Sequence, residues 1–337
     1  MKEYNVAVLG ATGAVGQQMM KVLEERNFPV KRLLPLASAR SAGKQLVFRG
    51  EALSIEEAME ASFAGMDIVL GAVSNEMAKR FAPAIQDSGA VFIDNSSAFR
   101  LREDVPLVVP EINPEDAFQH HGIVANPNCS TIITMVALGG IRRLTAIDKM
   151  VACTYQAVSG AGQQGITELQ DQLRAVTLGE PVQPHVFPCQ IVSNVIPQIG
   201  SECDNGYTTE EMKMQNEGRK IMHLPELQVC CTCVRVPVMR SHSIAVQLVT
   251  RDPISVEDAR QAVAAAPGCV LTDDLDGRNY PTPLDTSDQD LVYVGRIRRD
   301  LISGDHGLAL WCCGDQVRKG AATNAVQIAE LLARGQA

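Results

Sequence analysis

The stretch that decides the fold is "NVAVLGATGAVGQQMM", residues 5–20. It reads as a short apolar strand, a turn with glycines at positions 10, 13 and 16, and an amphipathic helix. In a phosphate-binding turn, Gly10 would permit the sharp bend, Gly13 the approach of a pyrophosphate, and Gly16 close packing of helix on strand. The spacing is G-x-x-G-x-x-G rather than G-x-G-x-x-G, so a ligand-free turn is the alternative. Its place at the first strand–helix junction favours nucleotide binding.

The first 125 residues continue this alternation of strand and helix patterns. Apolar runs of strand character lie at residues 66–73, 91–97, 106–112 ("PLVVPEI") and 122–128, and "NEMAKRFAPAIQDSG" at 75–89 has a helical period. Such alternation predicts a doubly wound, largely parallel sheet of the Rossmann type.

Beyond residue 128 the pattern changes to longer helices and broader strands. Residues 129–144, 165–176 and 320–335 have helical patterns, whereas 149–158, 229–238 and 243–250 read as strands. The sequence therefore predicts a second, α+β domain with a mostly antiparallel sheet.

Composition narrows the function classes. The chain has 337 residues, a formal charge of −9 and a pI near 5.2, which argues against general affinity for nucleic acid or anionic membranes. No signal peptide and no apolar span of about 20 residues is visible, so we expect a cytoplasmic protein. The ten cysteines are then expected to stay reduced. Cys230, Cys231, Cys233, Cys312 and Cys313 lie in apolar strand-like runs and are expected to be buried, and we predict no metal site.

The end of the predicted second strand indicates which nucleotide is bound. An acidic residue there selects NAD, whereas an arginine accommodates the 2′-phosphate of NADP. "LLPLASARSAGK", residues 33–44, has no acidic residue and supplies Ser38, Arg40, Ser41 and Lys44. The sequence therefore favours NADP, although Arg40 could also be a solvated loop charge.

Cys129 follows an Asn-Pro-Asn turn in "NPNCSTIITMVAL" and should begin a helix. Exposed amides and the positive end of the helix dipole favour a thiolate there. With a nicotinamide cofactor, a thiolate adds to an aldehyde, and loss of hydride from the adduct leaves a thioester. Phosphate can cleave that thioester to an acyl phosphate, and the reverse sequence reduces an acyl phosphate.

This chemistry also needs an acid/base and cations for the substrate. His242, in "MRSHS", could be an imidazole facing a cleft, and Arg235, inside a strand pattern, could offer a fork to a carboxylate. A surface or core histidine and an edge-strand charge are the alternatives. Glu217 and Lys220 share a helix face, which a simple salt bridge would explain equally well. Arg100 follows a predicted strand end, where ligands of parallel sheets gather.

The chain resembles the aspartate-β-semialdehyde dehydrogenase family over nearly its whole length. The motifs that carry the resemblance are "GATGAVG", "LASARSAGK", "DNSSAFR", "VPLVVPEIN", "NPNCSTI", "TYQAVSGAG", "NVIPQI", "EEMKMQNEGRKIM", "TCVRVPVMRSHS", "VGRIRRD" and "KGAATNAVQIAE". It implies NADPH-dependent reductive dephosphorylation of aspartyl phosphate on the route to lysine, threonine and methionine, by a homodimer or homotetramer. It also implies that the C-terminal helix returns to the nucleotide domain, which gives predicted domains of 1–127 plus 317–337 and 128–316.

The resemblance assigns roles residue by residue. Cys129 would be the nucleophile, His242 the acid/base, and Gln156 would orient the reacting carbonyl. Glu217 and Arg235 would hold the amino and carboxylate groups, with Lys220, Arg100 and Asn128 at the phosphate. The cofactor would contact Gly10, Thr12, Gly13, Ala14, Val15, Ser38, Arg40, Ser41, Ser159, Gly160 and Gln316.

Two rival functions stay open on sequence alone. An N-acetyl-glutamyl-phosphate or glyceraldehyde-phosphate type of reductase shares the thioester chemistry but holds another substrate. A paralogue acting only through protein contacts would share the fold, because fold alone does not establish function.

Overall fold

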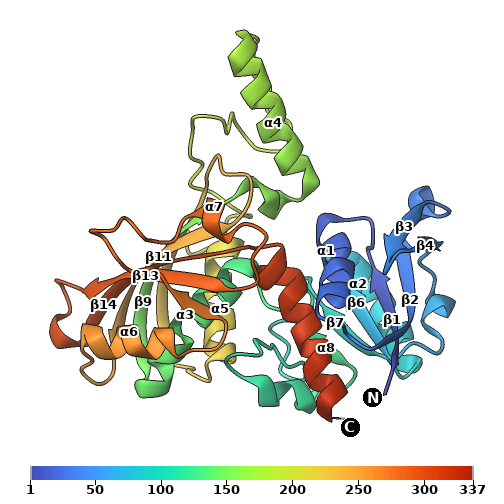
Figure 1. Cartoon of the computed structure of the whole chain (residues 1–337), viewed down its shortest axis with the longest axis horizontal. Helices are drawn as coiled ribbons and strands as arrows, with labels where there is room; N and C mark the ends of the chain where they lie inside the picture. The colour runs from blue at the N-terminus through green and yellow to red at the C-terminus, as the bar shows by residue number, and fades with distance from the viewer. Residues whose placement is uncertain (1, 336–337) are drawn as a thin grey trace. The chain divides into compact units, whose positions relative to one another are not determined.

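The computed structural model describes residues 2–335, and the chain divides into two compact units (Figure 1). One unit comprises the chain up to Asn128 together with the segment from Ala321, and the other is Cys129–Gly320. The predicted boundaries at 127/128 and 316/317 lie one and four residues from these. Residues 1, 336 and 337 of the predicted ranges lie outside the described part.

The first unit is built on a six-stranded sheet of order β5-β2-β1-β6-β7-β8 in which every pairing is parallel. Its strands are β1 (Tyr4–Leu9), β2 (Val30–Ala37), β5 (Glu56–Glu57), β6 (Ile68–Gly71), β7 (Val91–Asp94) and β8 (Ile123–Ala125). Its helices are α1 (Ala14–Glu25), α2 (Asn75–Asp87) and α8 (Asn324–Gly335), and β3 (Gln45–Phe48) and β4 (Glu51–Ser54) form a separate hairpin. The predicted doubly wound sheet is confirmed.

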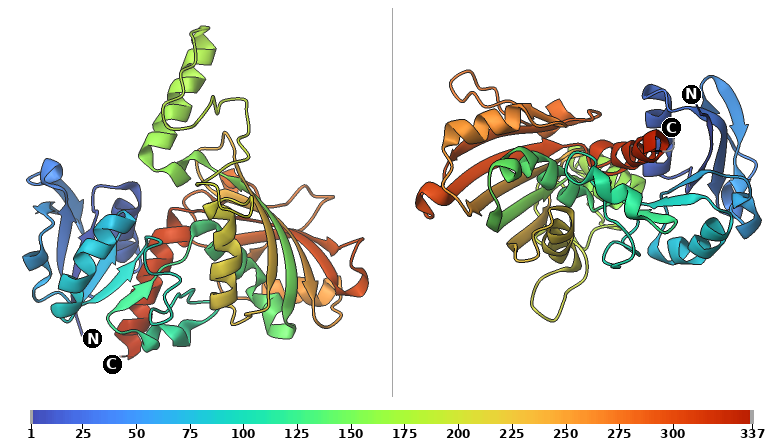
Figure 2. Two further views of the ribbon diagram at one scale, coloured as in Figure 1. Left: turned by 180° about the vertical axis from the view of Figure 1, so that it is seen from behind. Right: turned by 90° about the horizontal axis from the view of Figure 1, so that it is seen from below.

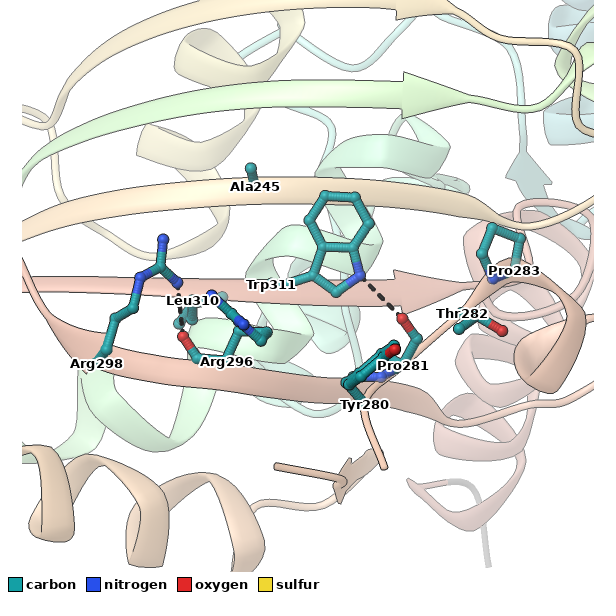
Figure 3. A pocket seen from close by; sticks show the side chains of 9 residues that line it. All are labelled: Ala245, Tyr280, Pro281, Thr282, Pro283, Arg296, Arg298, Leu310 and Trp311. Atoms are coloured by element: carbon teal, nitrogen blue, oxygen red, sulfur yellow. Dashed lines mark hydrogen bonds between the residues drawn. The ribbon is translucent and has the colours of Figure 1, made fainter. Parts of the chain in front are cut away.

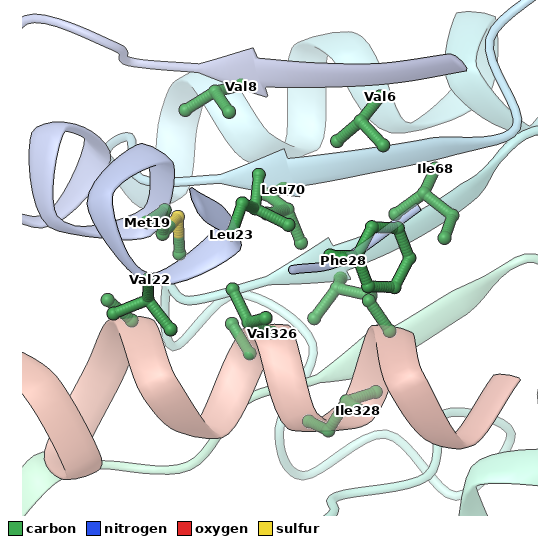
Figure 4. Close-up of a cluster of buried hydrophobic side chains, with 14 of the residues drawn as sticks. Val6, Val8, Met19, Val22, Leu23, Phe28, Ile68, Leu70, Val326 and Ile328 are labelled. Atoms are coloured by element: carbon green, nitrogen blue, oxygen red, sulfur yellow. The ribbon is translucent and has the colours of Figure 1, made fainter. Parts of the chain in front are cut away.

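The C-terminal helix α8 completes the core of this unit. Figure 4 shows Val326 of α8 pointing toward the sheet beside α1, which presents Val22 and Leu23, while Ile328 belongs to the same buried cluster from another side of α8. These side chains are almost fully buried. α8, more than 300 positions from β1 in sequence, is thus part of the same hydrophobic core. Its burial stabilises the first unit.

The second unit has a mixed sheet of order β10-β9-β11-β14-β13-β12. The three central pairings are antiparallel, and the outer two, β10 with β9 and β12 with β13, are parallel. The strands are β9 (Ile147–Gln156), β10 (Gln228–Arg235), β11 (His242–Thr250), β12 (Cys269–Leu271), β13 (Val292–Arg299) and β14 (Gly307–Gly314). The helices are α3 (Cys129–Leu144), α4 (Gln163–Leu178), α5 (Thr209–Ile221), α6 (Val256–Ala264) and the short α7 (Pro283–Thr286).

Within residues 2–335, the long helices that pack on this second sheet lie on one face. α3, α5 and α6 pack against its strands, and along β9 the buried Ala152 and Thr154 alternate with the exposed Val151 and Tyr155. On the open face Tyr155 packs on Trp311, with ring centroids 5.4 Å apart. An apolar sheet face of this kind indicates a protein interface.

Three local predictions were wrong. "PLVVPEI" is not a strand apart from one bridge between Leu107 and Ala125, because the run contains two prolines and the Asn113 side chain binds the Val109 amide and the Leu107 carbonyl at 2.9 Å each. The last helix begins at Asn324 rather than 320, after a π-helical turn.

The third concerns the cysteines. Cys230 is exposed, whereas Cys231, Cys233, Cys312 and Cys313 are buried as predicted. All ten cysteines are free in the described chain. No helix within residues 2–335 is long and apolar enough to cross a membrane.

Candidate functional site

The glycine turn after β1 has the geometry of a phosphate-binding turn. Gly10 has a φ of +91°, and a Cβ there would lie 2.3 Å from the Ala72 carbonyl oxygen. A Cβ on Gly16 would lie 2.2 Å from the Gly10 carbonyl oxygen. Both positions therefore exclude a side chain for reasons internal to the fold.

Gly13 is different, because nothing in the described residues requires it to be a glycine. Its φ is −76°, and a Cβ there would meet only the Gly10 carbonyl oxygen at an ordinary 3.5 Å. It is the N-cap of α1, and no side chain within residues 2–335 caps that helix end, where Thr12 is exposed and Ala14 and Val15 are half-buried. An uncapped helix N-terminus with space in front of it fits a nucleotide pyrophosphate.

The end of β2 lies next to this turn. β1 and β2 are paired in parallel, with Leu9 opposite Leu36, so the loop after β2 emerges beside the glycines. Ser38 precedes a 3₁₀ turn, Ala39–Ser41, in which Arg40 is exposed and Ser41 is buried. The predicted cofactor residues of this unit therefore lie together at the carboxyl ends of β1 and β2.

Arg100 also lies at the carboxyl ends of the strands of this sheet, beside β7 and β8. Its Nε donates to the Asn126 carbonyl oxygen at 2.9 Å and its Nη2 to that of Asn95 at 2.9 Å. These carbonyls follow β8 and β7, so the guanidinium is held at their carboxyl ends, as predicted. Asn128 is also buried in this unit.

In the second unit, strand register brings the catalytic candidates together. Arg235 ends β10 directly opposite Gln156, which ends the parallel strand β9. β11 is antiparallel to β9 and pairs Ser243 with Tyr155, so His242 starts its strand where the other two end. Arg235, His242 and the sequence-distant Gln156 thus meet at one corner of the sheet.

The peptide at Ala157 fixes two of these groups. Its N–H donates to His242 Nδ1 at 3.0 Å, and its carbonyl accepts from Arg235 Nη1 at 2.7 Å. Because Nδ1 accepts, the neutral ring carries its hydrogen on Nε2. That nitrogen lies 3.5 Å from the amide nitrogen of Gln156, so two N–H donors face the same space.

His242 is the first residue of β11 and is fully buried. Burial, and secondly the positive charge of Arg235, lower its pKa from 6.5 to about 3. Burial also lowers the pKa of Arg235, which the negative charges of Cys129 and Glu210 partly offset. The imidazole is therefore neutral at neutral pH in the ligand-free chain.

Gly160 packs tightly against both groups. A Cβ at this position would lie 2.7 Å from Arg235 Nη1 and 3.4 Å from His242 Nε2. The family resemblance implies a cofactor contact at Gly160, and the structure adds a steric reason for a glycine there.

Cys129 is the first residue of α3, as predicted, and is half-buried. Its charge interacts with Arg235. A Cβ on Gly320 would lie 2.9 Å from the Cys129 Cβ, so Gly320 makes room for the thiol. Sequence reasoning missed Gly320, whose only signal was a glycine at the expected start of the last helix.

Glu210, a glutamate that was not predicted from the sequence, contacts Gln156. Glu210, in the first turn of α5, accepts from the Gln156 amide at 3.3 Å and pairs with Lys213 at 2.7 Å. Glu217, predicted from sequence, is buried seven residues further on, about 10 Å along the helix axis. Glu210 and Lys213, at the start of α5, are therefore further candidates beside the predicted Glu217 and Lys220.

Gln316, a predicted cofactor residue, is hydrogen-bonded to Ser241, the residue before His242. Gln316 donates to the Ser159 hydroxyl and accepts the Ser241 N–H at 2.8 Å. Ser241 has a φ of +74° and its hydroxyl meets that of Thr286 at 2.5 Å. The residue before His242 is thus held in a strained conformation by its neighbours.

A dinucleotide-type unit followed by a unit in which Arg235 interacts with Cys129 and shares the Ala157 peptide with a buried imidazole is typical of a nucleotide-linked dehydrogenase. Known proteins narrow this class. The family model of the semialdehyde dehydrogenase NAD binding domain matches residues 5–120, and that of the semialdehyde dehydrogenase dimerisation domain matches residues 138–319.

Relatives match over almost the whole length of both chains. The chain is 48% identical over 336 residues to aspartate-semialdehyde dehydrogenase of Bacillus subtilis, covering 97% of each, and 50% identical over 327 residues to that of Synechocystis, covering 97% of this chain and 96% of the relative. The crystal structure of aspartate semialdehyde dehydrogenase II from Vibrio cholerae, complexed with ASA, superposes with a TM-score of 0.96 at 45% identity and 99% coverage of each. The chain belongs to the aspartate-semialdehyde dehydrogenase family.

Proposed function

We propose that this enzyme reduces L-aspartyl-4-phosphate to L-aspartate 4-semialdehyde, reversibly and in amino-acid biosynthesis, through an acyl thioester on Cys129. The observation that carries the residue roles is the convergence of Gln156, Arg235 and His242 at one sheet corner, with Arg235 in the field of Cys129. A thiolate nucleophile, two N–H donors and a fixed cation are what acyl transfer to sulfur requires.

In the first half-reaction the Cys129 thiolate, its proton lost to solvent, attacks the acyl carbon. The C–S bond forms, the C–O bond to phosphate breaks, and phosphate leaves. The carbonyl oxygen gains negative charge during the attack and accepts from Gln156 Nε2 and His242 Nε2. A proton taken up at Nδ1, in exchange for the Ala157 hydrogen bond, makes His242 an imidazolium that gives its Nε2 proton to the departing phosphate. Exchange with solvent then removes the Nδ1 proton and returns one to Nε2, so the Ala157 hydrogen bond re-forms and Nε2 is again a donor before hydride transfer.

NADPH, when bound, supplies a hydride to the thioester carbon. The same two donors then stabilise the tetrahedral oxyanion. As that oxyanion collapses, the C–S bond breaks, the aldehyde forms and the Cys129 thiolate is released. The cycle takes one hydride and one proton per acyl phosphate.

For the substrate, Arg235 is proposed to hold the α-carboxylate and Glu210 the ammonium group, each by a charge-assisted hydrogen bond. Lys213, Arg100 and Asn128 are proposed to bind phosphate. Glu217 and Lys220, the residues of the sequence prediction, are the other candidates for the ammonium and phosphate groups.

For the cofactor, we propose NADP rather than NAD. The family model supports a nicotinamide-nucleotide domain, and the exposed Arg40 beside the glycine turn supports a 2′-phosphate contact. Ser159, Gly160 and Gln316 are proposed for the nicotinamide end. Arg40→Ala should raise KM for NADP about tenfold or more while changing KM for NAD less than twofold, and equal effects on both would contradict the assignment.

We further propose a cytoplasmic homodimer formed through the open face of the second sheet. The dimerisation-domain match spans this sheet, and the free cysteines suit a reducing compartment. A pocket of about 420 Å³ lies on this face. Figure 3 shows Ala245 and Trp311 on neighbouring strands and Arg298 beside them. A second copy would cover these apolar residues.

Trapping the thioester tests the proposed route. The enzyme is incubated with aspartyl phosphate without NADPH and digested, and the peptides are weighed by mass spectrometry. An acyl adduct is expected on the peptide that holds Cys129 and should disappear in Cys129→Ala. An enzyme that turns over with NADPH but carries its adduct on another residue would overturn the role of Cys129.

A further inference from the structure

Helix α4 of the second unit extends away from the sheet and is followed by a long segment that returns to it (Figure 2). Glu168 and Gln172 lie one turn apart on α4, and both are almost fully buried. Buried carboxylates and amides are costly unless they are hydrogen-bonded, so their partners indicate what they do.

Together these two side chains bind the main chain of the returning segment. Glu168 accepts from the amides of His185 at 2.9 Å, of Val186, and of Phe187 at 3.4 Å. Gln172 donates to Glu168 at 3.0 Å, and its oxygen accepts from the amides of residues 191 and 192 at 2.9 and 3.1 Å. Five backbone donors outside any strand or helix are thus satisfied by one helix face, which fixes the path of the segment.

The end of this segment, at Ile196, pairs with Arg235. Ile196 exchanges both backbone hydrogen bonds with Arg235, at 2.9 and 2.8 Å. Phe187, Ile191 and Ile196 form a small core with Val158 and other residues. The main chain of Arg235 is therefore tied to the same segment that Glu168 anchors.

The side chain of Arg235 is also supported from this segment. Its guanidinium carbon lies 5.8 Å from the centroid of the buried Phe187 ring. The Ala157 carbonyl and the backbone of Gly160 restrict the same guanidinium from other sides. A cation over an aromatic face is stabilised electrostatically, and a guanidinium ordered before binding loses less entropy when a carboxylate arrives.

We propose that Phe187, anchored by Glu168, is a positioning residue that holds the Arg235 guanidinium for the α-carboxylate of the substrate. It thereby contributes to selectivity for aldehydes that carry this carboxylate. The inference rests on the proposed role of Arg235 in substrate binding. Phe187 itself acts only through Arg235.

The experiment compares Phe187→Leu with Phe187→Tyr, using aspartate semialdehyde and 3-aminopropanal, which lacks the α-carboxylate. Phe187→Leu removes the aromatic face but keeps an apolar side chain, and should raise KM for aspartate semialdehyde about 5- to 20-fold with kcat changed less than twofold. KM for NADP and for 3-aminopropanal should stay within twofold. Phe187→Tyr should stay close to the parent enzyme, and Glu168→Gln, which loses acceptor capacity, should raise the same KM.

The matched control is Val195→Ala, an exposed apolar position in the same segment. It should leave every constant unchanged. Arg235→Lys and the double variant Phe187→Leu/Arg235→Lys complete a double-mutant cycle. Once Arg235 is replaced, Phe187→Leu should raise KM for aspartate semialdehyde no further.

The outcomes separate the two claims. An unchanged KM for aspartate semialdehyde in Arg235→Lys would refute the proposed role of Arg235. A raised KM in Arg235→Lys together with an unchanged KM in Phe187→Leu would overturn the positioning role alone. Additive effects in the double variant, or an equal rise of KM for 3-aminopropanal in Phe187→Leu, would also overturn it.

Discussion

The buried imidazole of His242 should make the second unit lose stability in mild acid. Its pKa is about 3 in the folded chain against 6.5 in the unfolded one, so below pH 6.5 the unfolded state binds a proton that the folded state does not. The stabilisation is complete above pH 6.5 and is lost as the pH falls toward 3. At about pH 5 the loss is roughly 2 kcal/mol, from about 1.5 units at 1.36 kcal/mol per unit.

Urea unfolding at pH 8 and pH 5 measures this loss. The only tryptophan, Trp311, lies in β14 of the same unit and reports its unfolding by fluorescence. The free energy of unfolding of the parent enzyme minus that of His242→Gln should fall by about 2 kcal/mol between the two pH values, while carboxylate contributions cancel. Replacing the exposed His121 with Gln controls for loss of an imidazole as such. A difference that does not change with pH would refute the conclusion that burial holds His242 neutral.

Three further changes test the active site. Cys129→Ala should lower turnover by about four orders of magnitude or more while NADP affinity, measured by calorimetric titration, stays nearly unchanged; appreciable turnover would contradict the nucleophile assignment. Gly160→Ala should lower kcat/KM by about tenfold or more in steady-state assays, because the new methyl would lie 2.7 Å from Arg235 Nη1. A normal kcat/KM would show that the guanidinium can move aside freely. Glu210→Gln should raise KM for aspartate semialdehyde about 10- to 100-fold, whereas Glu217→Gln should change it less than about threefold; the reverse order would restore the sequence prediction.

The fold could be predicted where local pattern and topology agree. The strand, glycine turn and helix of residues 5–20 occur as predicted, because glycine conformation and strand–helix packing are local properties. "PLVVPEI" failed because its pattern is that of a strand, whereas it makes only two hydrogen bonds with Ala125, and Asn113, from outside the run, takes the Val109 amide and the Leu107 carbonyl. A side-chain substitute for a strand partner leaves no signal in hydrophobic periodicity.

The site could be predicted only in part, for a geometric reason. Cys129 and Arg235 lie within runs whose element type is clear, so the place of Cys129 at a helix start follows from the sequence. The sequence puts Arg235 inside a strand that reaches residue 238, and the structure ends that strand at Arg235 itself. The choice of glutamate does not follow from the sequence, because Glu210 and Glu217 are two turns apart on one helix face and each is followed three residues later by a lysine. Spacing alone cannot distinguish the two pairs. The helix start could have done so, since Thr208 caps α5 and thereby puts Glu210 in the first turn.

The strained residue before the histidine follows from the same corner geometry. β11 must begin opposite the last residues of β9, so the chain arriving from β10 has little length in which to turn. Ser241 makes that turn with a φ of +74°, which is unfavourable for a residue with a side chain, and a hydrogen bond from its N–H to Gln316 and a contact of its hydroxyl with Thr286 hold it there. Because Gln316 also binds Ser159, the group proposed for the nicotinamide end and the backbone that orients His242 belong to one hydrogen-bonded unit. A cofactor that changes the hydrogen bonds of Gln316 would therefore act on the conformation of the residue next to His242 without touching the imidazole.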